Sequence, residues 1–262
     1  GVLATIGLQA AINLLVVTGL APTKGIALPL DPSLVGNGLF AASDGHRIDV
    51  ADPAGPLVLN EDLALLASDT VAGDNFRFDV DLRGGRIAIG APFADNSSLD
   101  DGSAYLFDLE TGAELGKVTG GFGFLGDNFG NSVVLTENTL FVGVPRDDAS
   151  TTLSGSIRRF SLTTGQPTGQ ILPMGSQGES PVGHSLGEDI AVAGGLLVSG
   201  ARGDSFLANG GGSAQVFDAG SGAFVGKLFP SDPGFADNFG SSVGVTEDLI
   251  AVGSPFDDLN GE

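Results

Sequence analysis

The sequence contains no cysteine and no tryptophan, and only one tyrosine, one methionine and two histidines among its 262 residues. Without cysteine the chain can form neither a disulfide framework nor a thiolate site. The histidines, His46 and His184, offer little for zinc, which is held by sets of His, Cys and carboxylate ligands. Ser185 follows His184 directly, but adjacency in sequence does not make a catalytic triad.

Basic residues are also scarce. Lys and Arg together number 11 against 32 Asp and Glu, so the formal net charge is −21. Nucleic-acid binding needs a basic surface, and an anionic membrane would repel this chain. We therefore expect no nucleic-acid partner, and a membrane contact only through the uncharged segment 1–21. The acidity is explained by solubility, or else by cation binding or salty surroundings.

Glycine, in contrast, is abundant at 43 residues, and proline adds 13. The glycines follow no three-residue period, which excludes a collagen triple helix. A hydrophobic content of 42% is too high for a disordered chain. This composition is typical of many short strands joined by tight turns, and it predicts an all-β fold.

Many of the glycines belong to a repeat of more than 50 residues. The phrase DNFGNSVVLTENTLFVGVP (127–145) is nearly restated as DNFGSSVGVTEDLIAVGSP (237–255). A Phe or Leu marks each unit. One glycine follows it after fourteen residues, a second after a further twelve, and a third after a further ten. One unit is four residues longer than the others, with the insertion near Gln177. The marks are Phe76, Phe129, Leu186 and Phe239, then Gly90, Gly143, Gly200 and Gly253, then Gly102, Gly155 and Gly212, then Gly112, Gly165 and Gly222.

A period of this length suits a four-stranded propeller blade and is too long for helical hairpin repeats. In the unit marked by Phe129, we expect strands at SVVL (132–135), TLFVGV (139–144), SIRRFSL (156–162) and PTGQIL (167–172). The preceding unit repeats its third and fourth strands as SAYLFDL and ELGKVT. The recurrent Phe is predicted to fill the core between blades, each burial contributing roughly 1.5–3 kcal/mol.

These phrases resemble FG-GAP repeats, the blades of the integrin α-subunit propeller and of many bacterial secreted proteins. The resemblance covers about residues 74–262 and is closer to the bacterial, calcium-poor form. It implies a β-propeller of four-stranded antiparallel blades, with about four and a half blades present. Propellers of this family usually have seven, so we expect a fragment of a larger ring. The predicted propeller, 22–262, divides into blades at about 22–73, 74–126, 127–183 and 184–236, then a half blade at 237–262.

The segment 1–21 has nearly the length that spans a bilayer. A signal-peptide core, a membrane anchor and a packed element of the propeller are three interpretations that stay open for it.

Acidic residues suggest a cation site in two places. The integrin-type calcium loop sets acids at alternate positions; here the stretch DVDLRGGR keeps Asp79 and Asp81, but Arg83 replaces the third acid, so the family's loop is absent. A second set follows each GAP-like phrase and is expected on one edge of the propeller. We favour the interpretation that its members close turns by accepting hydrogen bonds from backbone N–H groups. The alternative is that they bind Ca²⁺ weakly. No other cofactor is expected. This set is Asp95, Asp100, Asp101, Asp147, Asp148, Asp204, Asp257 and Asp258.

Three short motifs have simpler explanations. The tripeptide RGD (202–204) stands where other units have PFAD or PRDD, which makes it a repeat variant. The stretch GFGFLG (121–126) matches a dinucleotide pattern, but a turn and a strand follow it where a helix is needed. The sequence NSS (96–98) is a glycosylation sequon in an expected loop.

Together these features predict a secreted or cell-surface binding or adhesion module without enzymatic activity. Its protein or glycan ligand would bind the loops on one rim, because propellers hold many loops rigidly on one face. Two alternatives stay open. One is a structural scaffold subunit of an envelope assembly. The other is a carbohydrate-active enzyme, which would need a pair of acids, although no singular pair stands out from the repeating ones.

Overall fold

In the computed structural model the described residues form only strands, turns and loops. The described part of the chain contains seventeen strands and no helix, so it offers no segment that could cross a membrane as a helix. The predictions for residues 1–21 and the insertion near Gln177 lie outside this part. The described residues are 39–41, 46–50, 59–69, 71–96, 98–121, 126–175 and 180–257.

The strands form five antiparallel sheets, three of which have four strands in the order of the chain. The first four-stranded sheet comprises β4 (Val80–Arg83), β5 (Arg86–Ala91), β6 (Ser103–Asp108) and β7 (Glu114–Thr119). The second comprises β8 (Ser132–Leu135), β9 (Thr139–Val144), β10 (Ser156–Ser161) and β11 (Pro167–Ile171). The third comprises β12 (Ile190–Ala193), β13 (Leu196–Ala201), β14 (Ser213–Asp218) and β15 (Phe224–Leu228). A three-stranded sheet precedes them, with β1 (Leu39–Ala41), β2 (His46–Val50) and β3 (Leu59–Ala64), and a two-stranded one follows, with β16 (Ser242–Val245) and β17 (Ile250–Gly253).

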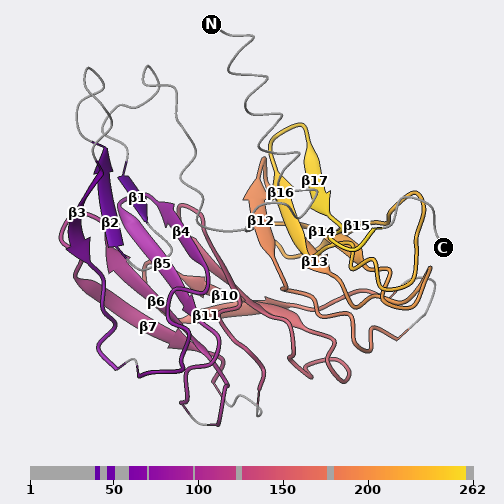
Figure 1. Ribbon diagram of the computed structural model, residues 1–262, viewed down its shortest axis with the longest axis horizontal. Coiled ribbons are helices and arrows are strands. Elements are labelled where there is room, and N and C mark those ends of the chain that lie inside the picture. The colour runs from indigo at the N-terminus through magenta and orange to yellow at the C-terminus, as the bar shows by residue number, and fades with distance from the viewer. Residues whose placement is uncertain are drawn as a thin grey trace, which may run out of the picture.

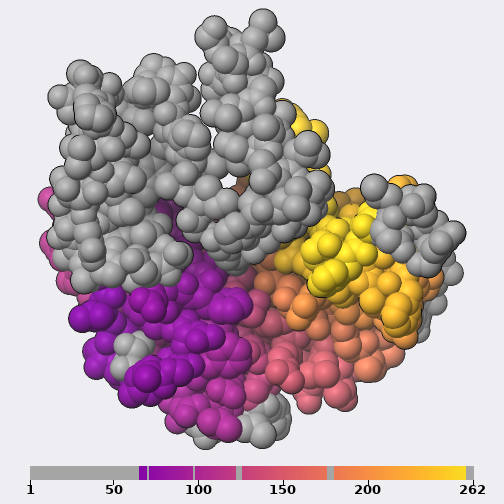
Figure 2. Space-filling model, in the orientation of Figure 1, coloured from indigo at the N-terminus to yellow at the C-terminus, as the bar shows by residue number. Residues whose placement is uncertain are grey.

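The sheets follow one another around an arc, as blades of a propeller that does not close within the described residues (Figures 1 and 2). The first strands of neighbouring blades, β4, β8, β12 and β16, contact one another in sequence order. The predicted strands of the unit marked by Phe129 are confirmed, with ends differing by at most one residue. The blade limits and the size of a complete ring stay predictions.

The apolar core lies between neighbouring sheets. Phe129 is fully buried, and its ring meets Phe160 edge-on with centroids 5.8 Å apart. The same cluster includes Ala88 and Ala104 from the preceding sheet and Val142 from its own. The prediction that the recurrent large residue is core is confirmed, since a single sheet cannot bury its face alone. Leu186 is likewise fully buried, whereas Phe76 and Phe239 are partly buried against their clusters.

The constant spacing of the first two glycines after the marker residue is explained by close backbone contact at the blade junctions. A Cβ atom on Gly200 would lie 1.8 Å from the carbonyl oxygen of Gly240, and one on Gly240 would lie 2.2 Å from that of Ser213. Gly212 forms a parallel bridge with Phe239, and its Cβ would lie 2.0 Å from the Phe239 oxygen. Residues from two units therefore meet where no side chain fits. The two preceding junctions repeat this arrangement at Gly90, Gly102 and Gly130, and at Gly143, Gly155 and Gly187.

The phrase DNFG, replaced by DNFR at 74–77 and by HSLG at 184–187, forms the turn that enters a blade. The Asp237 carboxylate accepts a hydrogen bond from the Gly234 N–H at 2.5 Å, and the Asp74 carboxylate accepts one from Val71 at 2.9 Å. Asn238 has φ 55°, a left-handed conformation that Asn tolerates better than most residues. The Asp237 carboxylate therefore closes the turn by accepting a backbone N–H.

Candidate functional site

The antiparallel order of each sheet places two groups of loops at the same end of the blades. One group joins the second and third strands, at 92–102, 145–155 and 202–212. The other enters the next blade, at 126–131, 180–187 and 229–240. Backbone hydrogen bonds connect them, from Gly183 N to Thr152 O at 2.9 Å and from Ala236 N to Asn209 O at 3.0 Å. We call these two groups together the loop rim. It carries six of the eight predicted acids; Asp257 follows β17, outside these ranges, and Asp258 lies outside the described residues.

Asp95 and Asp148 lie five residues after Gly90 and Gly143, the first repeated glycine of their units, and each closes its own loop. The Asp95 carboxylate accepts a hydrogen bond from the Asp100 N–H at 2.8 Å, and the Asp148 carboxylate accepts one from Leu153 at 2.6 Å. In the third loop the Ser205 hydroxyl accepts the equivalent bond from Gly210 at 3.0 Å. Each donor residue has a left-handed φ, between 52° and 69°, so the acceptor stabilises a strained turn. This is the turn chemistry that the sequence predicted.

Asp147 lies one position earlier, is 3% exposed and points beneath its loop. Its carboxylate accepts a hydrogen bond from the Ser156 hydroxyl at 2.5 Å and forms an ion pair with Arg158 at 2.6 Å. The preceding blade has Ala94 at this position. There Asp101 is the buried acid, and it accepts bonds from the Asn96 N–H and side-chain amide, both at 2.9 Å. The sequon asparagine is thus tied to the interior of its own loop.

Asp204 is the counterpart of Asp147 in the third loop and is 1% exposed. Its carboxylate pairs with Lys227 at 2.5 Å, accepts the Phe206 N–H at 2.9 Å and lies 3.6 Å from Nε2 of buried His184. Burial alone would raise the pKa of Asp204, but the Lys227 ammonium, with Ser213 and His184, outweighs it and leaves that pKa below its usual value. The RGD aspartate is therefore enclosed and paired, which agrees with a repeat variant and not with a presented recognition tripeptide.

The predicted acids do not gather at one point. Asp257 is partly buried near the end of the described chain, and the side chain of Asp100 is also partly buried. Within the described ranges no group of three or more His, Cys, Asp or Glu is placed to hold a metal ion. Calcium binding by these eight residues stays a prediction.

Two acids at the position of the family calcium loop act between blades. The Asp79 carboxylate accepts hydrogen bonds from Val80 at 2.9 Å and from Val133 of the next blade at 2.8 Å. Asp81 does the same with Leu82 and Leu135, at 2.9 and 2.6 Å. Burial raises the pKa of Asp81 in spite of the two backbone N–H groups that lower it. The sequence identified these acids as a remnant of a metal loop but gave no sign of their partners in the next blade.

The loop rim also exposes large apolar side chains, which the sequence analysis did not single out. Leu153 is 42% exposed and Val182 is 55% exposed, on loops joined by the Gly183 hydrogen bond. Leu207 and Phe235 repeat the arrangement one blade later, at 49% and 77%. Leu99 is 58% exposed on the first loop. The signal was available, because these apolar residues interrupt otherwise polar loop segments.

The comparisons with known proteins bear on the repeat. The FG-GAP repeat family matches residues 60–107 and 223–262. No curated protein matches the sequence. The crystal structure of the computationally designed Ika8 protein aligns with a TM-score of 0.49 and 15% identity, over 83% of this chain and 52% of that chain. This chain therefore spans about half the length of that protein.

The chain therefore contains FG-GAP repeats, matched at residues 60–107 and 223–262. FG-GAP repeats in general form binding or adhesion-type modules, and the family is generally non-catalytic. The dinucleotide interpretation of GFGFLG is not supported, because strand β8 follows it from Ser132 and the described residues include no helix.

Proposed function

We propose that this protein is a non-enzymatic binding module of the cell exterior, which engages a protein or glycan ligand through the loop rim. The observation that supports this is the repeated display of exposed apolar side chains on tightly hydrogen-bonded loops. A monomer gains nothing in its own folding from such side chains in water, and contiguous exposed apolar groups mark interaction sites. The blades below hold the loops in place, so little conformational entropy is lost on binding.

The acids of the rim support the same proposal in a different way. Asp95 and Asp148 fix loop shape, while the deeper Asp147 and Asp204 anchor the loops to the third and fourth strands through Arg158 and Lys227. Apolar side chains at the tips of rigid loops, held in place by hydrogen bonds and ion pairs beneath them, are typical of a preorganised binding surface. A cation-assisted contact is a finer version of the proposal, which the calcium experiment of the Discussion tests.

A triple substitution on the rim tests the proposal. Purified protein is applied to a glycan array and to immobilised extracellular matrix proteins, next to the variant Leu153→Ser/Leu207→Ser/Phe235→Ser. We expect a saturable ligand whose binding the variant loses, because central apolar anchors carry most of the energy of an interface.

The control is Leu115→Ser/Leu249→Ser, which changes side chains that are 53% and 72% exposed but lie on β7 and on the turn before β17, away from the rim. This control should bind like the unsubstituted protein. The proposal is wrong if no member of either panel binds, or if the rim variant and the control behave alike.

A further inference from the structure

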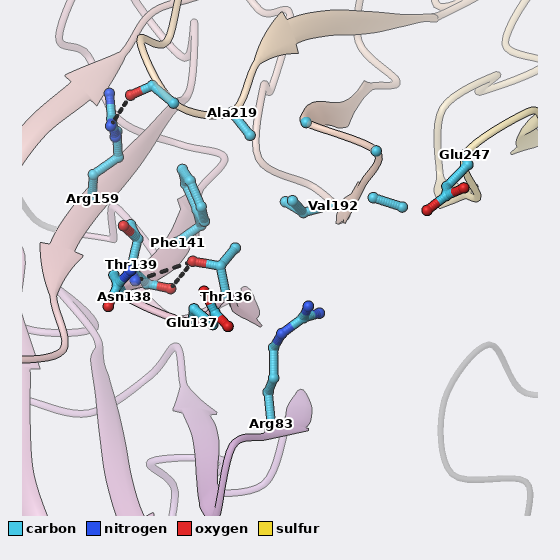
Figure 3. A pocket seen from close by; sticks show the side chains of 14 residues that line it. Arg83, Thr136, Glu137, Asn138, Thr139, Phe141, Arg159, Val192, Ala219 and Glu247 are labelled. Carbon is cyan, nitrogen blue, oxygen red and sulfur yellow. Dashed lines mark hydrogen bonds between the residues drawn. The ribbon is translucent and has the colours of Figure 1, made fainter.

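A polar pocket lies at the opposite end of the blades from the loop rim. It has a volume of about 520 Å³ and is lined by residues from four successive blades (Figure 3). Six of the fourteen lining residues belong to turns between the first and second strands, among them Glu137, Gly194 and Glu247, and Arg83 is the last residue of β4 before the corresponding turn. Pockets of this volume are within the usual range for small-molecule ligands.

The pocket exists because the turns alternate in composition from blade to blade. The tip is Gly-Gly at 84–85 and at 194–195, whereas it is Glu-Asn at 137–138 and Glu-Asp at 247–248. The Gly194–Gly195 turn lies between two turns that carry a glutamate, and it has no side chain to fill the space. A Cβ on Gly194 would approach the Cα of Glu247 to 3.3 Å. The backbone of this turn therefore borders the pocket, and the glutamates stand on either side of it along the arc.

The charged groups of the pocket are available for a ligand. Figure 3 shows Arg83 and Glu247 reaching into the space between the turns from different sides. Within the described part of the chain, the side chains of Arg83, Glu137 and Glu247 make no hydrogen bond or ion pair. Arg159 lies along the wall, donates a hydrogen bond to the Gly220 carbonyl at 2.5 Å and lies over the Phe141 ring at 5.8 Å.

The guanidinium groups are notable in a chain that has only 11 basic residues and a net charge of −21. A planar guanidinium binds a carboxylate with two parallel hydrogen bonds, a geometry that a lysine does not offer. The glutamates, in turn, are acceptors for hydroxyl groups. They would also repel a ligand that carries several negative charges close together.

The complementary ligand therefore has a single carboxylate surrounded by hydroxyl groups. We propose that this pocket binds a sugar of the uronic acid type, with its carboxylate on Arg83 and its hydroxyls on Glu137 and Glu247. A neutral sugar would leave the guanidinium without a partner. A peptide would need an apolar subsite, whereas Phe141 is only 1% exposed and the other apolar lining residues are Val192, Ala193 and Ala219.

The test is calorimetric titration with galacturonate, which has one carboxylate, and with its methyl ester, which has nearly the same size and no charge. The unsubstituted protein should bind galacturonate with a measurable heat and saturation, and the ester should bind about 10- to 100-fold more weakly. Arg83→Gln should lose the same factor for galacturonate and should bind the two sugars alike. Its melting temperature should be unchanged, because Arg83 is exposed and its side chain makes no hydrogen bond to another described residue.

Lys117→Gln is the control, because it also removes one positive charge but lies on β7, outside both the pocket lining and the loop rim. It should bind galacturonate like the unsubstituted protein. The proposal is overturned if galacturonate does not bind, if the ester binds equally well, or if Arg83→Gln and Lys117→Gln give the same affinity. Binding of triglycine that is lost in Arg83→Gln, without binding of galacturonate, would assign the pocket to peptides instead.

Discussion

The Asp79 carboxylate accepts a hydrogen bond of 2.8 Å from the backbone N–H of Val133, 54 residues further along the chain and in the next blade. Two blades later, Asp189 and Val243 form the same bond with the same length. The intervening blade has Ser132 at this position, and its hydroxyl donates to the Gly187 carbonyl at 2.9 Å. The inner strands of neighbouring blades are thus joined by side chains that alternate with a period of two blades.

Removal of one such acceptor should weaken the junction between two blades. We expect Asp79→Ala to lower the free energy of unfolding by about 1–3 kcal/mol, since the Val133 N–H is left buried without a partner. Urea unfolding followed by circular dichroism measures the change. Asp248→Ala removes the same charge from an exposed turn and should change stability by less than about 0.5 kcal/mol. Equal effects of the two substitutions would show that the bond across the junction contributes nothing.

The glycines at the blade junctions should tolerate no side chain, unlike a glycine in the outer strand of a blade. Gly200→Ala would place a Cβ 1.8 Å from the Gly240 carbonyl oxygen, so we expect a loss of about 3 kcal/mol or more, or failure to fold. A Cβ on Gly226 in β15 would meet no atom within 4 Å, and Gly226→Ala should be neutral or stabilising by up to about 1 kcal/mol. Thermal unfolding of both variants measures this. A stable Gly200→Ala protein would contradict the close contact.

Two lysines at the same position of different blades should differ in their contribution to stability. Lys227 is 7% exposed and pairs with the buried Asp204, whereas Lys117 is 23% exposed and pairs with the half-exposed Asp69. Lys227→Met leaves a buried carboxylate unpaired and should cost about 3–5 kcal/mol. Lys117→Met breaks a solvated pair and should cost less than about 1 kcal/mol. Urea unfolding at neutral pH separates the two cases, and equal losses would contradict the assignment.

The Asp204 ion pair also predicts a dependence of stability on pH. Because the folded-state pKa of Asp204 is lowered, its stabilising contribution is present above the unfolded-state value of 3.8 and is lost as the pH falls through the folded-state pKa. In Lys227→Met, burial without the ammonium raises that pKa instead. The difference in stability between the unsubstituted protein and this variant should therefore shrink from pH 7 to pH 3. Urea titrations over that range measure it, and a constant difference would exclude the coupling.

Calcium should have little effect on stability, because the carboxylates of Asp95, Asp147, Asp148 and Asp204 already bind protein groups. Calcium in tenfold excess over its dissociation constant would add about 1.4 kcal/mol to the free energy of unfolding. We expect no such rise in a thermal melt compared with EDTA. A rise that EDTA reverses would instead make the loop rim a cation-dependent surface.

The blade architecture could be predicted from the sequence because its signals are local or strictly periodic. Strand alternation, polar turns and glycines at fixed offsets are set by backbone sterics within one unit, and they identified β8 to β11 to within one residue. The burial of Phe129 followed from the same repeat, since one large apolar residue per blade has to fill the space beside it.

The partners of the charged residues were decided only by the tertiary structure. The sequence marks Asp79, Asp147 and Asp204 as acids at repeat positions, but it does not show that the first accepts a backbone N–H of the next blade. Nor does it show that the others are buried against Arg158 and Lys227. A carboxylate can coordinate calcium, pair with an ammonium or accept a hydrogen bond from an N–H group, and its place in the sequence does not distinguish these roles. Which of them it meets depends on how neighbouring blades pack, and that packing also forms the pocket around Arg83 from four separate turns.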